Sequence, residues 1–199
     1  SLFVLQSYNS YVAKIRTEKE RLEKRRSNWT RLGLSINKEI NNFKGNSGVV
    51  IVDLSTGWEF SYNKERLFPS ASLVKVPIMV ASLIACAQNR LDINRPIVLR
   101  RNDKLAGSGS LKNMPVGTAF PLGRLIGLMI YDSDNTATNI ITSLLGIDYL
   151  NKVFKAFGLK DTFLLRRVAD YNARKKGIEN YTSAKDMALL FEKLYYGKL

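Results

Sequence analysis

Histidine is absent from the 199 residues, and cysteine occurs once, as Cys86. Without histidine, no Ser-His-Asp triad, Cys-His dyad or histidine zinc site can form, so acyl-transfer chemistry would have to use Lys, Asp, Glu or Tyr. Cys86 cannot form an intrachain disulfide, and its apolar surroundings favour a buried core thiol. A continuous run of about 18 apolar residues is also lacking, so the sequence predicts no membrane-spanning helix.

Acidic residues are scarce relative to basic ones, since 17 Asp and Glu accompany 31 Lys and Arg and the formal net charge is +14. The basic residues are scattered and no nucleic-acid-binding signature accompanies them, so we expect no nucleic-acid partner. An anionic membrane surface or an acidic cell-wall polymer fits this charge as well. The share of hydrophobic residues, 45%, is that of an ordinary folded protein of one domain or two small lobes.

Apolar side chains between residues 8 and 43 recur mostly every three or four positions, which is the period of a helix. Residues 14–26 are dense in charge and contain pairs such as Glu20 and Lys24 that support a solvated helix. We interpret 1–28 as a charged helical stalk or membrane-proximal segment, with a coiled-coil seam as the alternative, and 29–199 as the domain proper. Gly33 is a candidate break before a second helix, and the apolar residues 2–5 fit the trailing end of an anchor or signal segment.

Three Ser-x-x-Lys pairs are present, and a serine beside an amine is a candidate activated nucleophile. Ser61 lies on a predicted strand, where alternation of side chains would turn Lys64 to the opposite face. Ser35 and Lys38 lie on the solvent side of a predicted helix. We therefore expect neither of these pairs to form a site.

The third pair, Ser72 and Lys75, precedes a run at 76–87 that is apolar nearly all round, which is typical of a buried helix. Ser72 would stand at the N-terminal end of this helix, where free N–H groups and the helix dipole favour developing negative charge. Lys75 would be partly desolvated, and desolvation lowers the pKa of an amine, so that it can accept a proton from Ser72 near neutral pH. The alternative is a capped helix end with a lysine that extends to solvent.

A second apolar helix, 122–131, leads into the polar run Ser133-Asp134-Asn135-Thr136-Ala137-Thr138-Asn139, and apolar residues follow again. A short polar loop between buried helices faces either water or a site. The stretch Phe68-Pro69-Ser70-Ala71-Ser72-Leu73-Val74-Lys75-Val76-Pro77, followed in order by this run, resembles the active-site serine enzymes of the class A β-lactamase and penicillin-binding-protein family. The resemblance extends from about residue 34 to the end of the chain.

The resemblance implies an α+β fold of the β-lactamase/transpeptidase type that is mostly helical in this chain. A complete all-helical lobe would be joined to an incomplete α/β lobe, which consists of one N-terminal helix and a hairpin of strands at 49–54 and 58–63. The sheet would then be completed by a further C-terminal segment or by a second chain. Without it, the first strand would expose an apolar edge, so we expect 1–199 alone to be poorly stable or to oligomerise.

The same resemblance implies roles for individual residues. Ser72 would be the nucleophile that forms an acyl-enzyme, Lys75 its activating partner, and Ser133 the relay of a proton to the leaving nitrogen. Asn135 would bind the side-chain amide of the substrate. Loops would be held in place by two further residues, Asp134 and Asn139.

Two parts of the family pattern are missing. The Lys-Thr-Gly or Lys-Ser-Gly motif of a late strand is not found, and Lys175-Lys176-Gly177 lies in a basic loop with no strand pattern. No glutamate occupies 166–174, where class A β-lactamases place the residue that activates the deacylating water. Asp170 is the one candidate substitute there, and we expect Glu179 to support the N-terminus of the next helix.

The sequence therefore predicts a serine β-lactamase-like hydrolase or D-Ala-D-Ala peptidase-like enzyme that acts on β-lactams or peptidoglycan-type peptides, with slow deacylation. The alternative is a catalytically silent relative that binds the cell wall or a partner, although a pure scaffold has no need of the four site residues together. We expect no cofactor and no metal, and a periplasmic or cell-surface location. The chain 1–199 by itself is expected to be impaired as an enzyme.

Overall fold

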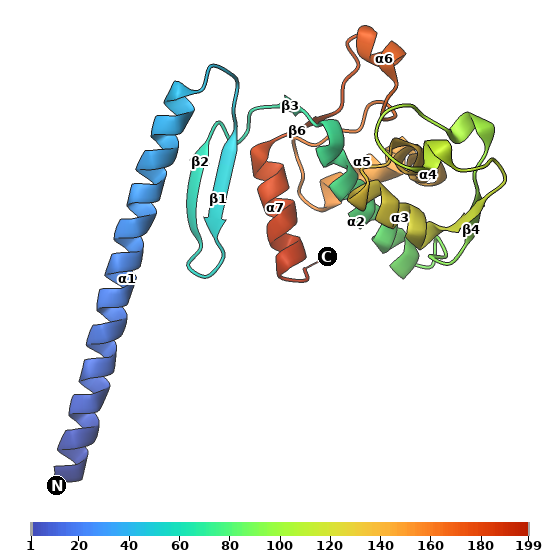
Figure 1. Ribbon diagram of the computed structural model, residues 1–199. Helices are drawn as coiled ribbons and strands as arrows, with labels where there is room; N and C mark the ends of the chain where they lie inside the picture. Colours follow the sequence, from blue (N-terminus) through green and yellow to red (C-terminus); the bar gives the residue numbers. More distant parts are fainter. Residues whose placement is uncertain (1, 199) are drawn as a thin grey trace. The chain divides into compact units, whose positions relative to one another are not determined.

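The structure is a computed structural model that describes residues 2–198, with side chains from residue 7 onward. Its contacts divide the chain into two compact units, with the boundary between Ser47 and Gly48. The first unit contains one long helix, α1 (Leu2–Asn42), drawn in blue in Figure 1. The predicted boundary at residue 28 falls inside α1, and the stalk stays a prediction.

Helix α1 continues through Gly33, so the predicted break there is wrong. One glycine inside a helix lowers helix stability by only about 1 kcal/mol relative to alanine. The hydrogen-bonded turns before and after Gly33 outweigh this loss. Charged side chains cover the middle of the helix, and Arg16 forms an ion pair with Glu20 one turn later (3.1 Å). In the part of the chain that the structure describes, no helix has both the length and the hydropathy of a membrane span. The side chains of residues 2–5, interpreted as the end of an anchor, lie outside the described residues.

The second unit begins with the predicted hairpin, formed by β1 (Val49–Asp53) and β2 (Trp58–Tyr62). The strands are antiparallel, and Val49 lies opposite Tyr62. Helix α7 (Ala184–Tyr195) contacts β1. The hairpin therefore has helical cover within this unit (Figure 1).

In neither of the two other Ser-x-x-Lys pairs is the amine buried. Ser35 and Lys38 are both exposed on α1, as predicted. Strand β2 ends before Lys64, so the alternation argument does not apply to this residue. Its amine instead pairs with the carboxylate of Glu59 at 2.8 Å. The pair at Ser61 therefore offers no free amine to activate a hydroxyl.

Four helices pack around one apolar core: α2 (Lys75–Ala87), α3 (Leu122–Tyr131), α4 (Asn135–Leu145) and α5 (Ile147–Ala156). Helix α2 contacts the other three, as its apolar sequence predicted. Burying one large apolar side chain stabilises the fold by about 1.5–3 kcal/mol. The fully buried side chains from these helices include Ile78, Leu125, Met129, Ile141 and Leu150. Cys86 is partly buried against this core.

Short strand pairs connect the helices. Strand β3 (Phe68–Pro69) pairs with β6 (Tyr181–Thr182), and β4 (Pro96–Val98) pairs with β5 (Ala119–Pro121). The β3–β6 pair brings the segment before α7 next to the N-terminal end of α2. A short helix, α6 (Tyr171–Lys175), lies on the loop between α5 and β6.

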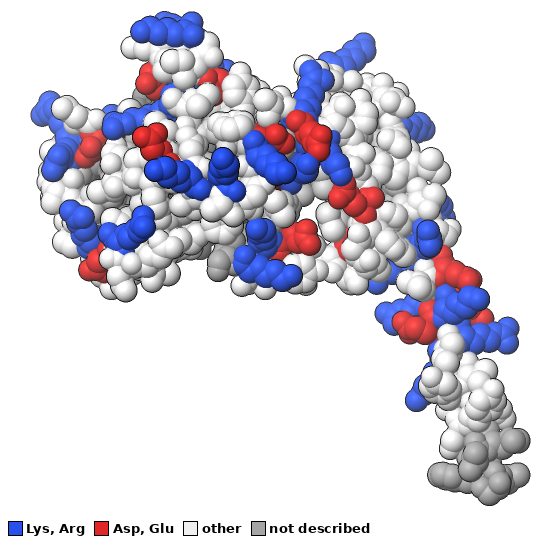
Figure 2. All heavy atoms as spheres, turned by 180° about the vertical axis from the view of Figure 1, so that it is seen from behind, with Lys and Arg blue, Asp and Glu red and all other residues white. Residues whose placement is uncertain are grey.

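Charged side chains of both signs are spread over the face of the second unit that Figure 2 shows. Lys and Arg side chains are interspersed there with Asp and Glu rather than gathered into one basic patch. The excess of positive charge is therefore distributed over this face.

Candidate active site

Ser72 lies one turn before α2, in the 3-10 helix η1 (Ala71–Val74), and is exposed. The preceding residue, Ala71, has a φ of +44°, a conformation that residues other than glycine rarely adopt. Such backbone strain persists where the surrounding structure imposes it, and it is common at functional sites. The hydroxyl of Ser72 is thereby presented at the surface, directly ahead of the N-terminus of α2.

Lys75 is 2% exposed, so the alternative of a lysine that extends to solvent is wrong. Its Nζ lies 2.6 Å from the Ser133 carbonyl oxygen, 2.8 Å from Ser133 Oγ and 2.9 Å from Asn135 Oδ1. A longer contact, 3.4 Å, joins Nζ to Ser72 Oγ. Burial lowers the pKa of Lys75, and the nearby Asp134 carboxylate partly opposes this change.

Ser133 completes a triangle of polar atoms with the other two residues. Its hydroxyl lies 3.0 Å from Ser72 Oγ and is also within hydrogen-bond distance of the Lys75 amine. Like Ala71, Ser133 has a positive φ, of +49°. A proton can therefore pass between Ser72 and Lys75 either directly or through the Ser133 hydroxyl.

Asp134 is fully buried and caps the N-terminus of α4, where its Oδ1 accepts the Ala137 N–H at 2.9 Å. Its other oxygen accepts the N–H of Leu111 at 2.8 Å. The connecting loop passes very close, since a Cβ added at Gly109 would lie 2.2 Å from the Asp134 carboxyl. Asp134 therefore ties the loop at 107–111 to the helix that carries Asn135.

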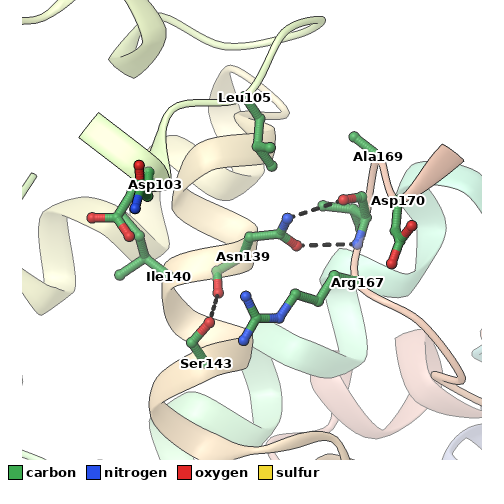
Figure 3. A pocket seen from close by; sticks show the side chains of 10 residues that line it. Asp103, Leu105, Asn139, Ile140, Ser143, Arg167, Ala169 and Asp170 are labelled. Atoms are coloured by element: carbon green, nitrogen blue, oxygen red, sulfur yellow. Dashed lines mark hydrogen bonds between the residues drawn. The ribbon is translucent and has the colours of Figure 1, made fainter. Parts of the chain in front are cut away.

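Asn139, one turn further along α4, binds the main chain of Val168 twice (Figure 3). Its Nδ2 donates to the Val168 carbonyl at 3.0 Å, and its Oδ1 accepts the Val168 N–H at 3.1 Å. Two cavities share Val168 and Ala169 as lining residues. One is lined also by Ser72, and the other, shown in Figure 3, is lined also by Asp103 and Asn139.

Asp170 lines the second cavity, and it is not among the residues that line the cavity at Ser72. Its carboxylate caps α6, because Oδ1 accepts the Ala173 N–H at 2.9 Å. The chain turns at Ala169, with a φ of +57°, just before this cap. The structure therefore does not place the predicted substitute carboxylate in the cavity at Ser72.

Glu179 lines the cavity at Ser72, and its predicted support of the next helix is wrong. Its carboxylate binds the guanidinium groups of Arg166 and Arg174, and it also accepts the Asn180 N–H at 2.8 Å. Helix α7 is capped instead by Ser183, because strand β6 separates Glu179 from the start of that helix.

Asn180 is a structural residue that the sequence did not indicate. It is 3% exposed, and its Oδ1 accepts the N–H groups of Leu165 and Arg166 at 2.8 and 3.0 Å. Its carbonyl oxygen accepts the N–H of Ser70 at 2.7 Å. These bonds fasten the loop that bounds the cavity to the segment that carries Ser72. A lone asparagine in a polar loop carries no sequence signal for such a role.

The cavity at Ser72 has a volume of about 230 Å³. Its lining combines the Ser72 hydroxyl, the buried amine of Lys75 and the side chain of Asn135 with residues of the 166–180 loop. That arrangement is suited to acyl transfer. The residues that line it are Ala71, Ser72, Lys75, Asn135, Arg166, Val168, Ala169, Tyr171, Arg174, Glu179 and Asn180.

Residues 31–199 match the sequence profile described as the Beta-lactamase enzyme family. The chain belongs to this family. Among curated relatives, the β-lactamase CARB-3 of Pseudomonas aeruginosa is 30% identical over 156 residues, which are 75% of this chain and 52% of the relative. The chain therefore spans about half the length of the curated relatives it matches.

Solved structures of the family share the fold of this chain. A β-lactamase from Sphaerobacter thermophilus is 35% identical with a TM-score of 0.69, over 76% of this chain and 57% of its own. PBP-A is 28% identical with a TM-score of 0.77, over 85% of this chain and 63% of its own. A mutant of PBP-A has been solved as an acyl-enzyme complex with penicillin G. The predicted family resemblance and α+β fold class are confirmed.

Proposed function

We propose that this protein is an active-site serine hydrolase in which Ser72 forms an acyl-enzyme with β-lactams or peptidoglycan-type peptides. The observation that carries the proposal is the buried amine of Lys75, which contacts the hydroxyl groups of both Ser72 and Ser133. Such a group has no packing advantage over an apolar side chain of similar size, but it is what a serine nucleophile needs. We propose an extracytoplasmic location, where peptidoglycan-type substrates are found.

In the proposed acylation, Ser72 Oγ attacks the carbonyl carbon of the substrate, and the carbon–nitrogen bond breaks after the carbon–oxygen bond has formed. The Ser72 proton moves to the neutral amine of Lys75, directly or through Ser133, and Ser133 then delivers a proton to the leaving nitrogen. Burial favours the neutral amine because it lowers the pKa of Lys75. The N-terminus of α2 stabilises the negative charge that develops on the carbonyl oxygen.

Asn135 is suited to orient the acyl group. Its Oδ1 accepts from Lys75, and the two N–H groups of its carboxamide remain as donors. A carbonyl oxygen in the side-chain amide of the substrate is the matching acceptor. Asp134 and Asn139 would contribute indirectly, because they hydrogen-bond to the loops on either side of Asn135 and so hold them in place.

Deacylation is proposed to be slow, because a base that activates water is needed next to the acyl bond. Glu179 is the one carboxylate among the residues that line the cavity, and two arginines and a backbone N–H bind its oxygens. Asp170 is engaged as the cap of α6. This favours a peptidase-like or penicillin-binding role over rapid β-lactam hydrolysis.

Intact-mass analysis of the natural full-length protein with excess benzylpenicillin tests the proposal. We expect an adduct of the mass of the penicillin that persists for many minutes and disappears in Ser72→Ala. Ser61→Ala is the matched control, since it removes the serine of another Ser-x-x-Lys pair and should leave the adduct intact. Rapid release of hydrolysed penicillin would instead indicate a β-lactamase, and absence of any adduct would indicate a catalytically silent relative.

A further inference from the structure

The cavity at Ser72 contains more positive than negative side chains. Its ionisable lining groups other than tyrosine are Lys75, Arg166, Arg174 and Glu179. The carboxylate of Glu179 binds both arginines, with Arg174 Nε at 3.2 Å from Oε2. One carboxylate neutralises only one of two guanidinium groups, so a positive charge remains on this side even when Lys75 is neutral.

The two arginines are not equivalent. The side chain of Arg166 is 12% exposed, and its terminal nitrogens donate to the Arg167 carbonyl oxygen and to Glu179. Arg174 is 62% exposed and is bound to Glu179 through Nε. Among the described residues, nothing accepts a hydrogen bond from its two terminal nitrogens, which carry four N–H groups. Arg174 is therefore the arginine of this cavity that can bind an incoming anion.

Arg174 lies where it could contact the acyl side chain of a substrate bound at Ser72. It lies on α6 together with Tyr171, and both residues line the same cavity as Ser72 and Asn135. An acyl group attached to Ser72, with its amide at Asn135, would place the far end of its side chain in this cavity, which Arg174 also lines. A planar guanidinium with free terminal N–H groups matches a carboxylate at that end.

We propose that Arg174 binds a carboxylate on the acyl side chain of the substrate, so that this site selects acyl donors with an anionic side chain. The chemical class is an acylamide in which a second carboxylate lies near the side-chain amide, as in a carboxy-substituted penicillin or a peptide with an acidic residue there. The inference rests on the acylation by Ser72 proposed above.

Three penicillins that differ at a single carbon of the acyl side chain test the inference. Benzylpenicillin carries hydrogen there, carbenicillin a carboxylate and ampicillin an ammonium group. The measurement is the second-order rate of adduct formation on the natural full-length protein at low ionic strength. We expect carbenicillin to react faster than benzylpenicillin, and ampicillin to react most slowly. Salt should reduce these differences, because the interacting group is partly exposed.

Arg174→Gln should lower the ratio of the carbenicillin rate to the benzylpenicillin rate by about three- to tenfold, as expected for one partly exposed charged hydrogen bond. Arg174→Lys, which keeps the charge, should restore part of the ratio. Lys175→Gln is the matched control, because it removes the same charge from the next residue of α6, which does not line the cavity. The three variants should melt within a few degrees of the parent.

Results other than these would contradict either the role of Arg174 alone or the proposed acylation by Ser72 as well. If all three penicillins acylate Ser72 and the ratio is the same in Arg174→Gln, the inference is wrong and the proposed function stands. An equal fall of the ratio in Lys175→Gln would show that the general field of α6, and not a contact with Arg174, selects the anion. Failure of every penicillin to form an adduct would overturn the proposed function and this inference together.

Discussion

Asn139 binds both main-chain polar groups of Val168, with hydrogen bonds of 3.0 Å to the carbonyl oxygen and 3.1 Å from the N–H. Because these bonds go to the main chain, they fix the loop without specifying the side chain at position 168. Val168 lines the same cavity as Ser72. Position 168 is thus a fixed point of the loop in the cavity at Ser72, and it carries an apolar residue.

A carboxylate at this position should supply the base that the cavity lacks. In Val168→Glu we expect the penicillin adduct to decay at least about tenfold faster, since general base catalysis contributes factors of about 10² to 10⁴ in well-positioned cases. The lifetime of the adduct by intact-mass analysis measures the effect. Val168→Gln, of the same shape without the charge, should leave the lifetime unchanged. An unchanged lifetime in folded Val168→Glu would contradict the expectation.

The two hydrogen bonds between Asn139 and Val168 should contribute measurably to the free energy of unfolding. Asn139→Ala leaves the N–H and carbonyl of Val168 without their partners, so we expect the free energy of unfolding to fall by about 2 kcal/mol. Asn139→Asp keeps the acceptor for the N–H and loses the donor to the carbonyl, and it should cost about half as much. Denaturant unfolding of the natural full-length protein measures both. Equal stability of parent and Asn139→Ala would show that the loop is held by other contacts.

The acylation rate should depend on the protonation of Lys75. Burial lowers its pKa below the ordinary value of 10.5, so the neutral amine forms at a lower pH than in an exposed lysine. We expect the rate to rise with pH and to level off once Lys75 is neutral, with a midpoint below 10.5. Lys75→Arg, whose guanidinium keeps its proton, should lose the reaction by about 10²-fold or more. A pH-independent rate in the parent would count against Lys75 as the base.

The lowered pKa of Lys75 also makes the free energy of unfolding depend on pH. In the unfolded chain Lys75 has its ordinary pKa, so at a pH between the two values the unfolded state binds more protons than the folded state. The contribution of this residue to the free energy of unfolding therefore rises with pH until the ordinary pKa is passed. Comparing the slope of stability against pH in the parent and in Lys75→Met isolates this contribution.

Two buried threonines of α4 differ in whether their hydroxyl group forms a hydrogen bond, so their substitutions can be compared. Thr142 is 2% exposed, and its hydroxyl has no hydrogen-bond partner among the described residues. Thr138 is fully buried, and its hydroxyl donates to the Asp134 carbonyl oxygen at 2.6 Å. Thr142→Val should stabilise the protein by about 1 kcal/mol, and Thr138→Val should destabilise it by a similar amount. Thermal melting compares them, and a loss of stability in Thr142→Val would reveal an additional partner.

The local elements could be predicted because each depends on neighbouring residues. The period of apolar side chains indicated α1, runs of apolar residues located α2, α3 and α4, and the ordered motifs at Ser72 and Ser133 indicated the family. Element ends were less certain, since Gly33 does not interrupt α1 and the α-helix after Ser72 begins only at Lys75. These ends depend on the balance between small local preferences and contacts elsewhere in the fold.

The sequence by itself determined the pair of Ser72 and Lys75 and the helices beside it, because these features repeat or lie within one turn of each other. Only the tertiary structure decided that Glu179 binds two arginines, that Asp170 faces another cavity and that Asn180 fastens the loop beside Ser72. The physical reason is that a carboxylate or amide in a polar loop has many possible partners of similar energy. The packing of segments distant in the chain selects among them.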